Sequence, residues 1–435
     1  MDRSMKNSGY DWIGDIPSEW PVLSAQRGFT EVKKKNADGA VQKALQFKFG
    51  TIIPKANFEA DSDDYVADTI TSYTIVEPGT VMINGLNLNY DFKTQRTALV
   101  KEKGVITSAY LALWPDTSKI TPEYATYLFK GYEAKMALHN MGSGIRLTLG
   151  WKEFKKQPVL FPPIQEQYRI VSFLDRKCAE IDSVIAATQR TIEEYKALKQ
   201  SIITEAVTKG VRGKRPMKDS GIEWFCEIPE EWATSRVGLH YDIILGKMLC
   251  AVQPSEDYTL ERYFCAANVH FDGISDCDAL KEMWFSEQEK KLYQVKNGDL
   301  LVVEGGAGAG GSAIVTGFTG TAFIQNSIMI VRGKKNGDNR YLRYFLEHLV
   351  KQGYIEVACN KATIPHFTKD KLATVPYPVV PAEEQEEIAN YLDSKCSEIE
   401  RLIISKQQLL IELESYKKSV IYEYVTGKKE VPACQ

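Results

Sequence analysis

An internal repeat constrains the fold of this 435-residue chain more than any other feature of its sequence. The segment MKNSGYDWIGDIPSEW at residues 5–20 recurs 212 positions later as MKDSGIEWFCEIPEEW at residues 217–232. The segment PPIQEQYRIVSFLDRKCAEIDSVI at residues 162–185 recurs as VPAEEQEEIANYLDSKCSEIERLI at residues 380–403. Such self-similarity indicates a duplicated structural unit. Each copy therefore has three parts: a short opening segment, a variable domain and a long helix.

The repeated segment after each variable domain predicts a long helix. Pro163 and Pro381 stand in the expected first turn, where proline is tolerated, and no Gly or Pro interrupts residues 164–208 or 382–426. At 1.5 Å per residue, each helix would be roughly 60–68 Å long. Apolar residues alternate at spacings of four and three, which is the pattern of a coiled-coil seam. The other copy is the simplest partner for this seam, and packing on the helix's own domain is the alternative.

The seam residues, together with the Glu-Gln pair that begins each helix, are the candidate partner and coiled-coil contacts. They are Glu166, Gln167, Leu174, Cys178, Ile181, Ile185, Glu384, Gln385, Leu392, Cys396, Ile399 and Ile403. If a pseudo-twofold axis relates the copies, the two helices are antiparallel. The end of the second helix would then lie near the first opening segment.

Composition excludes several classes of protein. No apolar run approaches the roughly 20 residues of a membrane helix, and the polar N-terminus is not a signal peptide. The eight cysteines contain no C-x-x-C pair, which favours reduced thiols over disulfides or zinc and predicts a cytoplasmic protein. The net charge of −3 predicts weak non-specific attraction to DNA from this chain alone.

The stretch LLVVEGGAGAGG at residues 300–311 fits the dinucleotide-binding pattern G-x-G-x-x-G through Gly306, Gly308 and Gly311. A cofactor site also needs a helix that begins on the glycines. Here the β-branched run SAIVTGFTG follows, which predicts another strand, and the matching stretch from Val81 has no such glycines. The glycines are therefore interpreted as a hairpin loop whose small residues allow close approach of the backbone, for example to DNA.

The sequence also lacks the other enzyme motifs for which it was compared. The chain has no P-loop, no N/D-P-P-Y/F methyltransferase motif and no G-x-S-x-G elbow, and its five histidines lack metal-ligand spacing. We therefore expect no catalytic residue, no cofactor and no metal.

Two repeated motifs carry a resemblance to a known family. The pattern G-x-x-W-x-x-x-I-P-x-x-W occurs at Gly9–Trp20 and Gly221–Trp232, and P-x-x-E-Q occurs at Pro163–Gln167 and Pro381–Gln385. In order and duplication, over nearly the whole chain, they resemble the specificity subunit of a Type I restriction-modification system. The resemblance implies a non-catalytic subunit whose two target recognition domains each read one half of an asymmetric double-stranded DNA site. It also implies helices that set the spacing, two modification (methyltransferase) subunits as partners, and ATP-dependent restriction subunits recruited by the complex.

The predicted fold class is α+β, with two α/β-type target recognition domains joined by two long antiparallel helices. The recognition domains span residues 1–160 and 217–380. The central helix spans residues 161–216 and the C-terminal helix residues 381–435. A coiled-coil scaffold that binds only proteins remains the alternative to DNA readout, and a nucleotide-dependent enzyme built on the glycine pattern is a third reading.

Candidate DNA contacts come from polar, basic and aromatic loops, because Arg, Asn and Gln can make bidentate contacts with bases. They are Lys33, Lys34, Lys35, Asn87, Asn89, Tyr90, Lys93, Arg96, Arg146, Lys247, Gly306, Gly308, Gln325, Asn326, Asn360 and Lys361. An ordinary solvated surface position is the alternative for each. Trp12, Trp20, Trp224 and Trp232 recur in both halves, whereas a residue that reads sequence should differ, so we predict that they pack.

Overall fold

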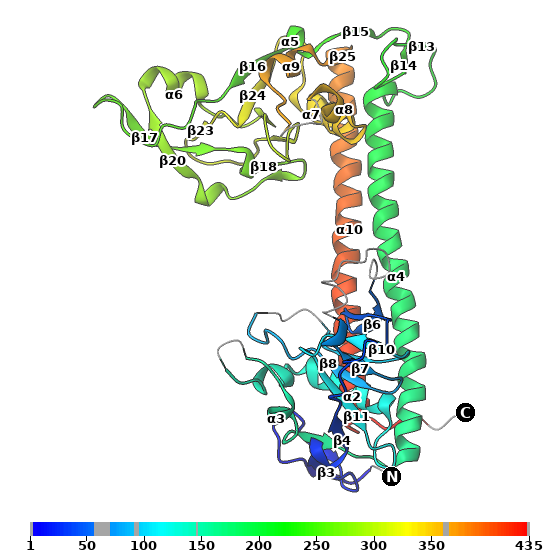
Figure 1. Cartoon of the computed structure of the whole chain (residues 1–435). Coiled ribbons are helices and arrows are strands. Elements are labelled where there is room, and N and C mark those ends of the chain that lie inside the picture. Colours follow the sequence, from blue (N-terminus) through cyan, green and yellow to red (C-terminus); the bar gives the residue numbers. More distant parts are fainter. Residues whose placement is uncertain (1–2, 56–69, 91–94, 145–146, 360–364, 433–435) are drawn as a thin grey trace. The chain divides into compact units, whose positions relative to one another are not determined.

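The computed structural model divides the chain into two compact units, drawn in Figure 1. It describes residues 3–55, 70–90, 95–144, 147–359 and 365–432. The first unit contains residues 1–189 and 407–435, and the second contains residues 190–406. Each unit thus combines one variable domain with parts of both long helices.

The first variable domain is built on a four-stranded antiparallel sheet with the order β4-β11-β8-β9. These strands are β4 (Phe29–Glu31), β11 (Leu111–Pro115), β8 (Val81–Ile83) and β9 (Thr97–Leu99), and the helix α2 (Pro122–Ala134) packs against β8 and β9. Two-stranded pairs surround it: β1 (Met5–Asn7) with β2 (Asp15–Pro17), β3 (Val22–Ser24) with β12 (Pro158–Leu160), β5 (Leu45–Lys48) with β6 (Thr51–Pro54), and β7 (Thr74–Val76) with β10 (Gly104–Ile106). Short helices are η1 (Ala25–Arg27), η2 (Ala137–Asn140) and α3 (Trp151–Phe154).

The second variable domain repeats this plan with the sheet order β16-β24-β21-β22 and the helix α7 (Asn339–Lys351). The strands are β16 (Tyr241–Leu245), β24 (Ile328–Gly333), β21 (Leu300–Val303) and β22 (Ser312–Ile314). The pairs β13 (Met217–Asp219) with β14 (Glu227–Pro229) and β15 (Ala233–Arg236) with β25 (Pro376–Val379) match those at the ends of the first domain. The repeat predicted from sequence is therefore a repeat of topology, and the fold is α+β.

The second domain also contains a lobe that is larger than its counterpart, the β5–β6 hairpin of the first domain. Its three-stranded sheet consists of β20 (Lys281–Phe285), β17 (Thr259–Phe264) and β23 (Phe323–Ile324), of which β17 and β23 are parallel. The remaining elements of the second domain as a whole are β18 (Val269–His270), β19 (Gly273–Ile274), α5 (Val237–His240), α6 (Glu287–Tyr293), α8 (Tyr354–Ala358), α9 (Lys369–Thr374), η3 (Ala266–Asn268) and η4 (Cys277–Ala279). This lobe is one place where the two copies diverge.

The two long helices match the prediction closely. Helix α4 spans Ile164–Lys209 and α10 spans Ala382–Val425. In the first unit, the ring of Phe173 lies 4.4 Å from that of Tyr424, and Lys417 pairs with Asp182 at 2.6 Å. Residue numbers therefore increase along α4 as they decrease along α10, and the helices are antiparallel as predicted.

In the second unit, Lys199 on α4 pairs with Glu400 on α10 at 3.1 Å. The predicted seam residues Leu174, Cys178, Ile181, Leu392, Cys396, Ile399 and Ile403 are buried, and Ile185 is half-buried. Leu174 and Cys178 also belong to the core of the first variable domain, as Leu392 and Cys396 do in the second. Both expected modes of packing thus occur, on the partner helix and on the helix's own domain.

The Glu of each repeated Glu-Gln pair forms what we call the tryptophan–glutamate lock. Glu166 accepts a hydrogen bond from the indole N–H of buried Trp20 (3.0 Å) and ion-pairs with Arg3 at 2.6 Å. The guanidinium of Arg3 also lies 5.2 Å from the centre of the Trp20 ring. This lock ties the opening segment to the first turn of α4.

The second copy of the lock has the same members. Glu384 accepts from the indole N–H of Trp232 (3.1 Å) and pairs with Arg215, whose guanidinium lies 5.0 Å from the Trp232 ring centre. Both tryptophans are fully buried, which confirms the prediction that they pack. The expectation of a seam or partner contact for Glu166 and Glu384 is corrected, because their carboxylates are used inside their own units.

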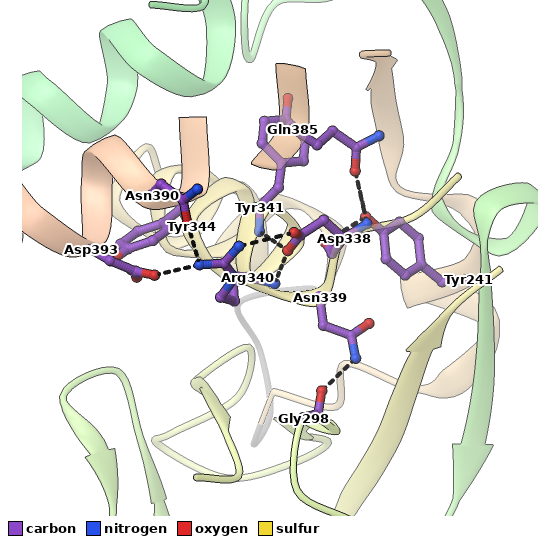
Figure 2. Close-up of polar contacts among 10 residues, drawn as sticks. All are labelled: Tyr241, Gly298, Asp338, Asn339, Arg340, Tyr341, Tyr344, Gln385, Asn390 and Asp393. Carbon is purple, nitrogen blue, oxygen red and sulfur yellow. Dashed lines mark hydrogen bonds and ion pairs between the residues drawn. The ribbon is translucent and has the colours of Figure 1, made fainter. Parts of the chain in front are cut away.

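The Gln of each pair holds the start of the domain helix. Gln385 accepts from the backbone N–H of Asp338, the residue that caps α7 (2.9 Å), and donates to the carbonyls of Asn336 and Val380. Figure 2 shows this contact and the neighbouring Tyr241 hydroxyl. Gln167 does the same in the first unit: it accepts from Thr121 N–H (2.8 Å) and donates to Lys119 O and Pro162 O. Both glutamines are buried, so the expected seam or partner role is corrected for them too.

Replacing Glu384 by alanine tests the lock. The side chain of Glu384 is 1 % exposed, so Glu384→Ala leaves the Trp232 N–H without its partner and removes the buried one of the two carboxylates that pair with Arg215, the other being exposed Glu231. We expect a loss of about 3–5 kcal/mol in the free energy of unfolding, measured by urea denaturation followed by circular dichroism. The control is Glu386→Ala on the exposed face of the same helix, which should stay within about 0.5 kcal/mol. Equal midpoints for both variants would contradict a structural role for the lock.

Candidate nucleic-acid interface

Each variable domain presents a pair of loops at the same end of its four-stranded sheet. The first loop joins the last two strands of the sheet: residues 84–96 connect β8 to β9, and residues 304–311 connect β21 to β22. The second loop consists of residues 147–150 before α3 in one domain and of residues 365–368 before α9 in the other. Because the repeat places both loops at matching positions, they are the surfaces to compare for a function that differs between halves.

Backbone hydrogen bonds hold the two loops side by side. In the first domain, Leu149 N–H donates to Gly85 O at 2.9 Å, and a Cβ on Gly85 would lie only 2.3 Å from Leu149 O. In the second domain, Phe367 N–H donates to Glu304 O at 2.6 Å. We call each such arrangement a loop pair. The close approach explains why the first loop pair requires glycine at position 85.

The first loop pair displays polar and aromatic side chains from an apolar anchor. Leu88 is buried, and its N–H donates to Leu147 O at 3.3 Å. On either side, Asn87 is exposed, with a left-handed φ of 52°, and Asn89 is half-buried. Tyr90 is 75 % exposed. The structure therefore brings Asn87, Asn89 and Tyr90 together on one short, anchored turn.

Arg96 has a different place from the one expected. Its side chain is 1 % exposed, and its guanidinium donates to the carbonyls of Asn84 (3.0 Å), Leu86 (2.8 Å) and Asn87 (3.5 Å). Its backbone N–H donates to Glu133 on α2 at 2.8 Å, and burial raises the pKa of that carboxyl group. Since these contacts already use the guanidinium, Arg96 shapes the loop from beneath and is not displayed toward a ligand.

The second loop pair is a hairpin, as the sequence predicted. Strands β21 and β22 pair in antiparallel register from Leu300 opposite Ile314, and Val303 N–H donates to Gly311 O at 2.8 Å. No helix begins on these glycines, so the dinucleotide reading does not apply to them. Gly308 at the tip is exposed, and Gly306 is half-buried with a φ of 86°, where an added Cβ would meet no atom within 4 Å. This loop offers backbone groups where the first offers side chains.

A neighbouring turn joins the glycine hairpin. Glu304 N–H donates to Ser327 O at 2.8 Å, which places the Gln325–Ser327 turn beside the hairpin. Within that turn, the amide of Gln325 donates to the Asn326 side chain and accepts from Ser327 N–H at 3.1 Å. Gln325 and Asn326 are half-buried and linked to each other. The structure thus brings two more candidates to the second loop pair.

Lys247 follows β16 and lies beside the Gln325–Asn326 turn, where its O accepts from Asn326 N–H at 2.8 Å, but its charge is already paired. Its ammonium group lies 2.6 Å from a carboxylate oxygen of Glu289 and donates to Trp284 O at 2.8 Å. It also lies 4.8 Å from the centre of the Tyr258 ring, and the side chain is 11 % exposed. These contacts do not fit the predicted role as a displayed DNA contact. They hold the lobe against the end of β16.

The basic run Lys33, Lys34 and Lys35 follows β4 and is exposed. Lys33 pairs with Glu31 at 2.8 Å, and Lys35 donates to Ser72 O at 3.0 Å and to the Ser108 hydroxyl. Lys33 and Lys35 border a hollow of about 350 Å³. Its other lining residues are Glu31, Val32, Thr74, Ser108, Tyr110 and Ala112. The run forms a basic surface in the first domain, apart from the first loop pair.

Four candidates, Lys93, Arg146, Asn360 and Lys361, lie outside the described residues. Sequence reasoning overlooked Met248, Leu249 and Val252, which follow β16 as the basic run follows β4. They are 75 %, 60 % and 80 % exposed. The sequence indicated them by the uninterrupted apolar run Met248–Val252, which is too short for a helix and has no alternation typical of a strand.

The described part of the chain contains no group of three or more His, Cys, Asp and Glu side chains that could hold a metal ion. None of its helices has both the length and the apolar character needed to cross a bilayer.

Comparisons with known proteins point to one family. A sequence profile described as the Type I restriction modification DNA specificity domain matches residues 283–414. A specificity subunit of the type I restriction enzyme MjaVIII from Methanocaldococcus jannaschii is 23 % identical over 436 residues, covering 96 % of this chain and 94 % of that protein. The putative MjaX specificity subunit of the same organism is 24 % identical over 444 residues, covering 96 % of each chain.

Solved structures share the fold. A chain from a structure of type I restriction-modification complex assembly and conformational transition has a TM-score of 0.70 at 16 % identity, covering 95 % of this chain and 99 % of that one. The HsdS subunit from Thermoanaerobacter tengcongensis has a TM-score of 0.55 at 16 % identity, covering 97 % of this chain and 100 % of that one. Together with the duplicated motifs, these matches lead to one assignment. Over nearly its whole length the chain is similar to Type I restriction-modification specificity subunits, and its residues 283–414 match the DNA specificity domain of that family.

Proposed function

We propose that this chain reads a bipartite, asymmetric double-stranded DNA sequence, with one variable domain acting as the target recognition domain for each half. The observation that carries the proposal is the contrast between scaffold and loops. The four-stranded sheets have the same strand order, and the loop pairs occupy matching positions. The residues at their tips differ: Asn87 and Tyr90 in one, Gly306 and Gly308 in the other. A common scaffold with different reading surfaces suits recognition of two different half-sites.

The chemistry of each loop pair suits base readout in a distinct way. The Asn87 amide can donate and accept at once, which matches the edge of adenine in the major groove. The glycine hairpin allows backbone groups to approach closely where a side chain would intervene. The exposed run Lys33–Lys35 suits phosphate contacts, which position a protein without specifying sequence. The net charge of −3 leaves much of the phosphate attraction to partner subunits.

The long helices would fix the spacing of the half-sites and dock the partners. We propose two modification (methyltransferase) subunits as direct partners and ATP-dependent restriction subunits as members of the full complex. Exposed apolar side chains on the helices support a protein-binding role, because such residues often mark interaction sites. They are Tyr168, Val184 and Leu198 on α4 and Leu402, Ile404 and Ile411 on α10. In this arrangement residues 1–160 and 217–380 read DNA, and residues 161–216 and 381–435 form the spacer. We propose that the partner subunits, and not this chain, supply the catalytic groups.

The test is to map methylated adenines by long-read sequencing in cells that carry this chain with methyltransferase subunits. We expect one bipartite motif. A complex that methylates without any bipartite motif would contradict the proposal. A protein-only scaffold would instead leave the assembled complex unable to distinguish specific from competitor DNA in a binding assay.

The first loop pair yields a prediction about one half-site. Asn87→Ala combined with Tyr90→Ala should reduce methylation of the native site by about tenfold or more, because a lost base contact costs about 1–3 kcal/mol. Relaxed sequence preference should appear in one half of the motif only. Methylome mapping of the variant measures this, with exposed Tyr10→Ala in the opening segment as the control. A change in both halves would refute the assignment of one domain to one half-site.

Arg96 predicts a different outcome, because it holds the loop and does not face a ligand. Arg96→Ala removes the donor to three carbonyls and should cost about 1–3 kcal/mol of stability for each buried group left unpaired. We expect faster hydrogen exchange across residues 84–90 in the absence of DNA, measured by mass spectrometry. Exposed Arg27→Ala is the matched control. Unchanged exchange in the Arg96 variant would show that the loop keeps its shape without this residue.

A further inference from the structure

The last turns of the two long helices dock on matching faces, one in each unit. In the first unit, the hydroxyl of Tyr124 on α2 donates to Val425 O near the end of α10, at 2.9 Å. In the second, the hydroxyl of Tyr341 on α7 donates to Val207 O near the end of α4, also at 2.9 Å. Each helix therefore begins on one variable domain and ends on the other, and the faces that receive the two ends share a plan.

A second repeated contact supports this match. Tyr127 on α2 donates to Asp175 at 2.7 Å, and Tyr344 on α7 donates to Asp393 at 2.8 Å. Figure 2 shows Tyr344, Asp393 and the neighbouring Arg340, which pairs with Asp393 at 2.9 Å. The corresponding residues of α2 and α7 are 217 positions apart, so the two faces can be compared position by position.

The first face carries a small residue and receives a large one. Gly131 on α2 lies directly against α10, and a Cβ at this position would lie 2.7 Å from Val425 Cγ2 and 3.4 Å from Tyr422 Cα. The hydroxyl of Tyr422 reaches the opening segment, where it donates to Trp12 O (2.8 Å) and Ile13 O (2.9 Å). One side chain from the helix end thus satisfies the carbonyls of the opening segment.

The second face carries a large residue and receives a small one. His348 stands on α7 where α2 has Gly131, and Thr204 stands on α4 where α10 has Tyr422. His348 Nε2 donates to Trp224 O at 2.8 Å, because a carbonyl can only accept. Nδ1 is then the acceptor for the Thr204 hydroxyl at 3.0 Å. Trp224 is the counterpart of Trp12 in the repeat. The helix end contacts this carbonyl through His348 in the second unit and directly through Tyr422 in the first.

We propose that this exchange of size makes each docking face selective for its own helix end. A tyrosine at position 204 would compete for the space that buried His348 occupies. A threonine at position 422 is too short to reach Trp12 O, and Gly131 offers no side chain to bridge the gap. The face of the first unit therefore fits an α10 end, and the face of the second unit fits an α4 end.

A double-mutant cycle in the full-length chain tests the proposal. Thr204→Tyr alone should lower Tm by roughly 3 °C or more, a shift typical of one lost kcal/mol in a unit of this size. His348→Gly alone should also lower it, by removing the bridge to Trp224 O. Combining the two should recover much of the loss, because the tyrosine then reaches that carbonyl directly. Hydrogen exchange at residues 222–226 should follow the same order.

The reciprocal pair gives an independent reading. Gly131→His and Tyr422→Thr should each lower Tm, and their combination should lower it by clearly less than the sum, with exchange affected at residues 10–14 and not at 222–226. Thr204→Val is the control that keeps the size and removes the hydroxyl, and it should be milder than Thr204→Tyr.

If Thr204→Tyr proves insoluble, recovery of soluble protein by His348→Gly supports the proposal equally. The milder cycle of Thr204→Val with His348→Gln would then measure coupling across the hydrogen bond. Additive losses in every cycle, or a Thr204→Tyr variant as stable as the parent, would overturn it.

Discussion

The structure depends on a carboxylate buried at the first turn of each long helix. An ionised carboxylate is costly to bury unless it is paired and hydrogen-bonded. Glu166 and Glu384 meet both conditions, each with an arginine and with an indole N–H. The tryptophan precedes the first strand of the domain, β3 or β15, and the glutamate follows the last strand, β12 or β25, with which that first strand pairs. The lock therefore closes each variable domain where the chain enters and leaves it.

This closure explains how the two domains differ without loss of the fold. Gln167 and Gln385 orient α2 and α7 from the same turn of the long helix, and none of the locking groups comes from the loop pairs. The two domains differ at their loop tips and yet share the lock, the glutamine contacts and the sheet order. The larger lobe of the second domain likewise lies between the two strands that close that domain, β15 and β25. Different loops on a constant base are what the proposed reading of two half-sites requires.

The sequence predicted the features that repeat and missed those that depend on single tertiary contacts. Recurrence and periodicity identified both helices, their antiparallel pairing, the packed tryptophans and the hairpin at Gly306. The sequence could not show that the Arg96 side chain turns inward, because a polar loop residue has the same local sequence whether its partner is water or a buried carbonyl. Lys247 fails for the same reason, since Glu289 is distant in sequence.

One partner of the lock was visible and overlooked. Arg3 and Arg215 recur at the same offset of 212 as the opening segments, two residues before each repeated Met-Lys, in MDRSMK and GKRPMK. The recurrence of Glu166 and Glu384 indicated that they share a role, but not whether their carboxylates face a partner or the interior of their own unit. A repeated glutamate suits a partner-binding surface as well as an internal ion pair, and only burial distinguishes the two.

A duplicated chain must distinguish two similar helix ends, a requirement that a single domain does not have. Two faces built alike bind two helix ends with similar free energy, and discrimination arises only from the residues that differ. Apolar seam positions contribute little to that difference, because both helices carry the same pattern. A backbone carbonyl contributes more, since leaving it unpaired costs its full desolvation penalty. Placing the size exchange at the carbonyls of Trp12 and Trp224 therefore makes the wrong pairing costly in either direction, by steric conflict at His348 and by a lost hydrogen bond at Gly131.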